Sequence, residues 1–201
     1  MSWVVACEWR VDVRKRLTTH YPLLTIPLLL GCGSPDRLVP LAVGKKWDYR
    51  FSFGVQREVG RIEVVREVPV AGGTGWEIQG PTGVSRLGYV GDTLVADQLG
   101  GAFLTPSLPI GLPSGRSAQW RGWVNSPTGR LAAKATVFSD DSKIELSGRK
   151  RSLVRTVVSM KVNGHAVELA TWYAPSDGIV QQEQHTDQRL DLKLERIAGG
   201  S

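Results

Sequence analysis

The sequence predicts an all-β protein: a strongly curved antiparallel meander sheet, either a half-barrel or an open barrel, with no substantial helix in the mature domain. Segments that alternate apolar and polar residues recur about every ten residues, with turn residues between them. The 23 glycines and 11 prolines fit a turn-rich chain. No segment after the N-terminal region has an apolar period near 3.6 residues. About eleven strands would suit a curved sheet or an open barrel.

The N-terminal region carries an apolar run that begins at Pro22 and is about ten residues long, whereas a membrane-spanning helix needs roughly 20. Pro22 and Pro27 interrupt the run and argue against a buried helix. The basic cluster at 14–16 precedes it. Together these features predict a signal peptide over residues 1–31. Because the first dozen residues make this leader overlong, we expect the true translation start near residues 11–13.

The end of this leader resembles the lipobox of bacterial lipoproteins, with Leu29, Leu30 and Gly31 before Cys32. The resemblance implies cleavage after Gly31, a diacylglycerol on the thiol of Cys32, and an acyl chain such as palmitate on the new amino terminus. Two or more acyl chains give a stable membrane anchor. Two alternatives remain: an ordinary signal peptide, or a hydrophobic N-terminal strand with an incidental cysteine.

This interpretation predicts an exported protein of the cell envelope, attached to the membrane through Cys32. The absence of Asp after that cysteine implies the outer membrane, facing the periplasm, rather than the outer face of the inner membrane. Residues 32–41 are interpreted as a short tether and residues 42–198 as one β domain, consistent with 41 % hydrophobic and 22 % charged residues. Basic residues such as those at 148–151 are interpreted as a solvated strand edge or a contact with anionic membrane, not with nucleic acid.

Two segments place apolar residues on one face of a strand. The first is an alternating strand whose aromatic face packs in the core or forms a ligand-stacking wall; it comprises Trp47, Tyr49, Phe51 and Phe53. The second is a hairpin with a two-residue type I′ turn at Asn163-Gly164, because both turn positions require positive φ. This turn pairs Val162 with His165 and predicts an inward face that includes Val158, Met160, Leu169 and Tyr173.

Residues 105–117 form the longest stretch without strand character, since three prolines oppose regular sheet pairing there. Leu108, Ile110 and Leu112 are nevertheless apolar. We expect these side chains to plug one end of the curved sheet, or to act as a lid over its hollow.

Signals of catalysis or metal binding are missing from the sequence. His165 and His185 have no partners at metal-ligand spacing, and the adjacent carboxylates in residues 139–142 fit a solvated hairpin turn. No nucleophile elbow, phosphate-binding loop or dinucleotide-binding motif is present. We therefore expect no enzyme activity, no catalytic residue, no metal and no cofactor.

A second resemblance rests on three segments: "PLAVGKKWDYRF", "LPIGLPSGRSAQWRG" and "TWYAPSDGIVQQEQ". They are similar to segments of uncharacterised bacterial envelope lipoproteins, which resemble the half-barrel carriers of the Lol and mycobacterial lipid-carrier type. The resemblance implies a curved sheet that holds lipid in its hollow. The alternative is a tethered interaction or assembly protein with a filled core, an unknown envelope partner and no ligand. An open apolar trough of several hundred Å³ would favour the binding protein.

Overall fold

The computed structural model describes residues 37–197 apart from 128 and 147–148. The described residues form twelve strands and no helix, so none of their elements is a helix long and apolar enough to span a membrane. The strands are β1 (Lys46–Phe53), β2 (Gln56–Val70), β3 (Gly73–Gly80), β4 (Gly83–Val90), β5 (Thr93–Leu99), β6 (Ala102–Gly111), β7 (Ser117–Ser126), β8 (Gly129–Leu146), β9 (Arg149–Val162), β10 (His165–Ala174), β11 (Gly178–Thr186) and β12 (Arg189–Arg196).

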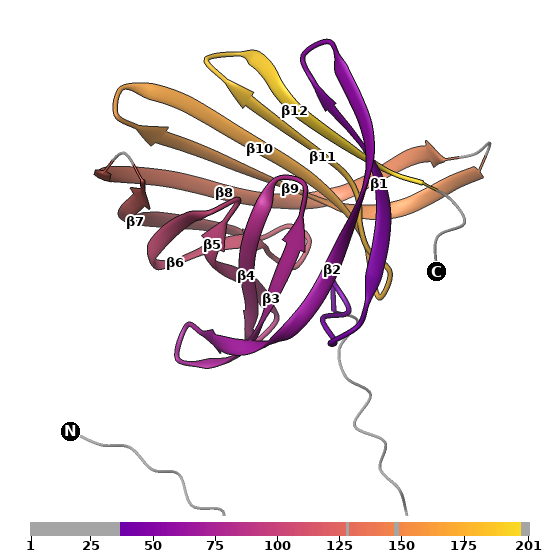
Figure 1. The fold of residues 1–201 in the computed structure, drawn as a ribbon, viewed down its shortest axis with the longest axis horizontal. Coiled ribbons are helices and arrows are strands. Elements are labelled where there is room, and N and C mark those ends of the chain that lie inside the picture. Colours follow the sequence, from indigo (N-terminus) through magenta and orange to yellow (C-terminus); the bar gives the residue numbers. More distant parts are fainter. Residues whose placement is uncertain (1–36, 128, 147–148, 198–201) are drawn as a thin grey trace, which may run out of the picture. The chain divides into compact units, whose positions relative to one another are not determined.

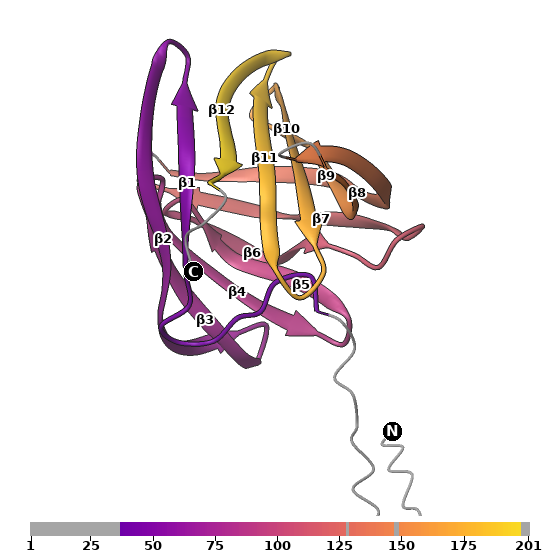
Figure 2. The ribbon, with the colours of Figure 1, turned by 90° about the vertical axis from the view of Figure 1, so that its right-hand side faces the viewer.

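Each strand pairs antiparallel with the next one in the sequence, and β1 also pairs with β12 (Figures 1 and 2). The closing pairs include Tyr49 with Arg196 and Phe51 with Leu194. The predicted helix-free, strongly curved meander is confirmed, and its curvature continues until the sheet closes into a barrel. Closure pairs the backbone groups that β1 and β12 would expose as the edges of an open sheet.

The aromatic face of β1 points into the barrel. Trp47, Tyr49 and Phe51 are buried there, and Phe53 packs half-buried against the same core cluster. The Phe51 ring meets Tyr49 edge-on and stacks on Phe53, with centroids 6.2 and 6.3 Å apart. Alternation therefore places one continuous aromatic surface inside the barrel and the intervening polar residues outside.

The hairpin of β9 and β10 has the register that the sequence predicts. Asn163 and Gly164 form its turn with φ of 49° and 83°, and Val162 lies opposite His165. Val158 and Tyr173 are buried. Met160 and Leu169 also pack against the core cluster but are only partly buried.

The segment expected to lack strand character is largely β6, which corrects the prediction for residues 105–117. The prolines shorten its pairing without preventing it: β6 pairs with β7 only over Phe103–Thr105, just before Pro106. Beyond that point the indole of Trp120 donates to the Pro106 carbonyl at 3.0 Å in place of a ladder bond. The apolar residues of the segment, Leu108, Ile110 and Leu112, are all buried.

The polar residues at 139–142 are not a hairpin turn, because β8 runs through them to Leu146. Ser139 is fully buried, and its hydroxyl lies 2.6 Å from that of Thr156 on β9. The same Ser139 oxygen accepts the backbone N–H of Leu112 at 3.3 Å. Because its hydroxyl has these hydrogen-bond partners, Ser139 can lie in the barrel interior. The polar character of the residue alone does not indicate that position.

Residues 38–41 belong to the folded domain, which corrects the boundary of the predicted tether. Leu38, Val39 and Leu41 are buried in the main core cluster. The hydroxyl of Tyr89 accepts the Val39 N–H at 2.8 Å and donates to the Val39 carbonyl at 3.1 Å. The predicted signal peptide and Cys32 lie outside the described residues.

Candidate ligand-binding cavity

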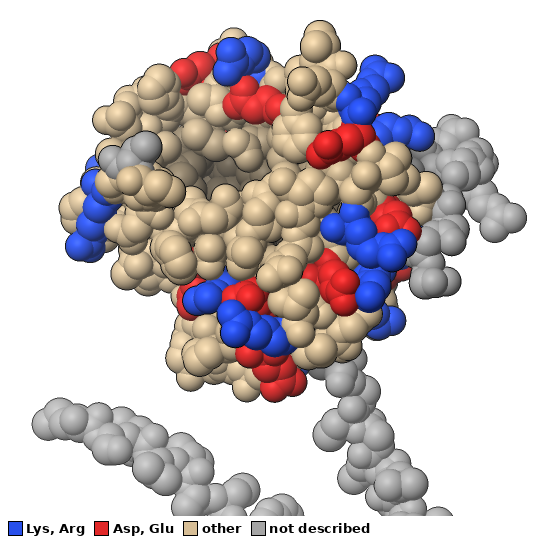
Figure 3. All heavy atoms as spheres, viewed as in Figure 1, with Lys and Arg blue, Asp and Glu red and all other residues tan. Residues whose placement is uncertain are grey.

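The barrel encloses a cavity of about 510 Å³. Its wall combines strands from both halves of the chain, and most of its side chains are aliphatic or aromatic. On the face seen in Figure 3 the molecule is hollowed, and most of the surface inside the hollow is uncharged. The apolar lining includes Val39, Trp47, Phe53, Ile62, Ile78, Leu87, Leu99, Ile110, Leu169, Ile179, Leu192 and Leu194.

Two tyrosine hydroxyls at the cavity wall are already engaged. Tyr49 donates to the carbonyl of Ile179, and Tyr173 donates to that of Ile110, each at 2.8 Å. Burial raises the pKa of both phenols well above the ordinary value, so both stay protonated at any physiological pH. These hydroxyls fix the positions of β1 and β10 and contribute no charge to the cavity.

All but one of the polar side chains of the described lining outside the aromatic residues are neutral. The neutral ones are Thr82, Ser85, Thr171, Gln182 and Gln184. Within the described part of the chain the only charged residue along the cavity is Asp191. It is the extra residue of a bulge in β12, where Gln184 lies opposite Leu192 and His185 opposite Leu190, so its carboxylate stays along the cavity, where it accepts from Arg189 at 3.1 Å. Hydrogen bonds from Thr186 and Arg189 hold the pKa of Asp191 below its ordinary value.

Several residues predicted from the sequence meet in this cavity. Trp47, Tyr49, Phe53, Leu169, Tyr173 and Ile110 line it, whereas Phe51, Val158, Met160, Leu108 and Leu112 pack elsewhere in the core. Sequence reasoning missed Gln182 and Gln184, because "QQEQHT" reads as a solvated segment. Their inward orientation depends on a bulge in β11 at Val180, which lies opposite Trp172 and Tyr173 and shifts the register.

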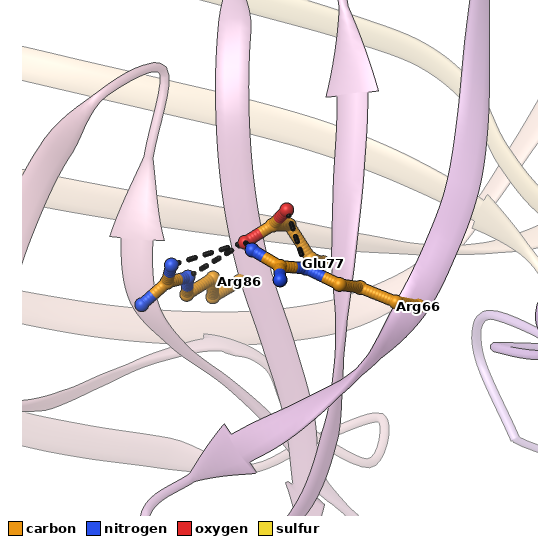
Figure 4. A network of polar contacts seen from close by, with 3 residues as sticks. All are labelled: Arg66, Glu77 and Arg86. Carbon is orange, nitrogen blue, oxygen red and sulfur yellow. Dashed lines mark hydrogen bonds and ion pairs between the residues drawn. The ribbon is translucent and has the colours of Figure 1, made fainter.

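The outer wall behind the cavity is held by a charged network across β2, β3 and β4 (Figure 4). Glu77 is buried and lies next to the cavity-lining Ile78. Its carboxylate accepts two hydrogen bonds from Arg66, both at 2.9 Å, and two from Arg86, at 3.1 and 3.0 Å. One carboxylate on β3 thus links β2, where Arg66 binds both of its oxygens, to β4, where Arg86 binds Oε2 alone.

This network predicts a pH-dependent contribution to stability. Hydrogen bonds from Arg66, and further ones from Arg86, hold the pKa of Glu77 below its ordinary value of 4.5 although burial opposes this. A lowered folded-state pKa means that the contribution is present above pH 4.5 and is lost as the pH falls through the folded-state pKa. Glu77→Gln should therefore lower the urea midpoint at pH 7, and the difference from wild type should shrink below pH 4.5.

Glu58→Gln, on the exposed part of β2, serves as the matched control and should leave the midpoint unchanged at both pH values. A Glu77→Gln deficit that stays constant down to pH 3 would contradict the assignment.

The candidate metal-binding and catalytic groups do not meet at the cavity. No group of His, Cys, Asp and Glu among the described residues could hold a metal ion. His165 Nδ1 lies 2.7 Å from Asp187 Oδ2, which joins the exposed tips of two neighbouring hairpins. Hydrogen bonds from His165 and from the Ala166 backbone lower the pKa of Asp187.

No protein-family model and no curated protein matches this sequence. Among solved structures, the chain is similar to a protein of Parabacteroides distasonis ATCC 8503 provisionally described as a lipoprotein, with 11 % identity and a TM-score of 0.48 over 81 % of this chain and 98 % of that one. It is also similar to a protein of Bacteroides fragilis NCTC 9343 provisionally described as exported, with a YmcC-like fold, at 11 % identity and a TM-score of 0.47 over the same shares. At this identity the similarity concerns the fold alone.

Proposed function

We propose that the protein is an exported lipoprotein of the cell envelope whose barrel binds a lipid or another hydrophobic molecule. The observation that carries the proposal is the open, largely apolar cavity of about 510 Å³. Its volume falls in the range of roughly 300–1,000 Å³ that is typical of small-molecule pockets. For an assembly protein without a ligand, we would expect a barrel interior that is filled with side chains.

The membrane anchor in this proposal rests on the sequence from Leu29 to Cys32, where the acyl chains would be attached. The anchor would keep the barrel beside the bilayer, which is both a source and a destination for a hydrophobic ligand. The outer membrane is the proposed location. We propose no catalytic role, no cofactor and no nucleic-acid partner.

The proposal is tested by native mass spectrometry of the protein purified from its own envelope, before and after blocking the cavity. Leu169 is a partly buried residue of the cavity wall. Leu169→Trp should fill part of the space and remove a co-purifying hydrophobic mass that the wild-type protein carries.

Glu168→Trp is the matched control, since it lies on the same strand but on the exposed outer face. It should retain the ligand. If the wild-type protein carries no mass and takes up no lipid when lipid is added, the proposal is wrong and the tethered assembly protein becomes the better interpretation.

A further inference from the structure

We infer that the cavity rejects anionic amphiphiles, and that Gln182 and Gln184 hold an uncharged polar group by hydrogen bonds. The ligand class is then a long-chain alcohol, ester or amide, and anionic amphiphiles such as free fatty-acid anions are disfavoured. This inference rests on the proposed function and adds the chemistry of the ligand's polar group.

The strand register directs both glutamines inward. Gln182 lies opposite Thr171 on β10 and Leu194 on β12, and both of these residues line the cavity. Gln184, two residues further along β11, shares that face and also lines the cavity. Two carboxamides therefore stand together in a wall that is otherwise mostly apolar.

Neither carboxamide makes a hydrogen bond to the described part of the protein. The neighbouring Gln181, in contrast, donates from Nε2 to the carboxylate of Glu183 at 2.9 Å. Both side chains are half-buried, so their two donors and one acceptor can exchange water for the polar group of a ligand. A ligand with a hydroxyl, ester or amide group can satisfy both glutamines.

The cavity offers nothing to balance a negative charge on a ligand. No Lys, Arg or His of the described residues lines it, and the charged group of the lining is the carboxylate of Asp191. Moving an ion from water into such a site without a partner costs far more than moving a neutral polar group. The discrimination applies to anions, because the described lining holds no cation and Asp191 adds a negative charge to it.

The test uses the full chain with Cys32→Ser, so that no acyl anchor contributes, and the neutral fluorophore N-phenyl-1-naphthylamine as the probe. Four sixteen-carbon competitors are compared below their critical micelle concentrations at pH 7.5: monopalmitoylglycerol, palmitamide, palmitate and hexadecyltrimethylammonium. The two neutral competitors and hexadecyltrimethylammonium should displace the probe at concentrations at least tenfold lower than palmitate.

Three variants assign the selectivity to the two residues. The double variant Gln182→Leu with Gln184→Leu should weaken the neutral competitors about tenfold while it still binds the probe. Gln184→Lys should remove the discrimination against palmitate, because it supplies the missing cation. Gln181→Leu, on the same strand but facing outward, should behave as wild type.

The outcomes separate this inference from the proposed function. If the wild-type protein binds neither the probe nor any competitor, the proposed function itself fails. If it binds them all with equal affinity, or if the double variant behaves like Gln181→Leu, the cavity binds hydrophobic molecules but the inferred selectivity is wrong.

Discussion

Phe51→Ala is expected to lower the free energy of unfolding by about 3–5 kcal/mol, the range for truncating a buried phenylalanine. Phe51 is fully buried between the rings of Tyr49 and Phe53 and pairs with Leu194 in the closing ladder. The strands on either side hold the backbone in place, so the space left by the ring cannot collapse. Urea unfolding followed by tryptophan fluorescence measures the difference.

Phe138→Ala is the matched control. This side chain is 46 % exposed on the outer face of β8, and its truncation should cost less than about 1 kcal/mol. Similar losses in both variants would show that the aromatic face of β1 is not the core surface described above.

Cys32→Ser is expected to abolish acylation and to leave an unprocessed precursor. The reason is chemical: the thiol is the proposed site of the diacylglycerol, and a serine hydroxyl is a much weaker nucleophile than a thiolate. Labelling of cells with an alkyne fatty acid, followed by gel analysis of precursor and mature forms, measures both effects.

The second cysteine of the chain supplies the control. Cys7 lies ahead of the proposed cleavage site and of the expected translation start, so Cys7→Ser should be labelled and processed as the wild type is. Labelling that persists in Cys32→Ser would exclude this residue as the anchor and favour one of the alternatives, such as an ordinary signal peptide.

Local features of this fold were readable from the sequence because local physics determines them. Asn163-Gly164 can adopt the two positive φ angles of a tight hairpin, and the register of β9 and β10 follows from that turn. The alternation around Phe51 likewise determines which face of β1 is buried, whatever the strand pairs with.

Features that depend on distant partners were not predictable in this way. Pro106 is tolerated in β6 because the Trp120 indole satisfies its carbonyl, and Ser139 is tolerated in the interior because Thr156 lies beside it. The inward orientation of Gln182 depends on a bulge between β10 and β11. Each case is decided by a neighbour from another strand, which periodicity within one strand cannot identify.

The pairing of β1 with β12 has a consequence for the timing of folding. The first strand gains its last partners only when the C-terminal strands are present. The hydroxyl of Tyr49 donates to the carbonyl of Ile179, 130 residues further along the sequence, and β12 completes the ladder beside it. Such non-local contacts require a large loop to close before any stabilisation is gained, so they form late and slowly. The barrel cannot close while its C-terminal strand is still being synthesised. A chain that crosses a membrane unfolded before closing its barrel would benefit from this delay.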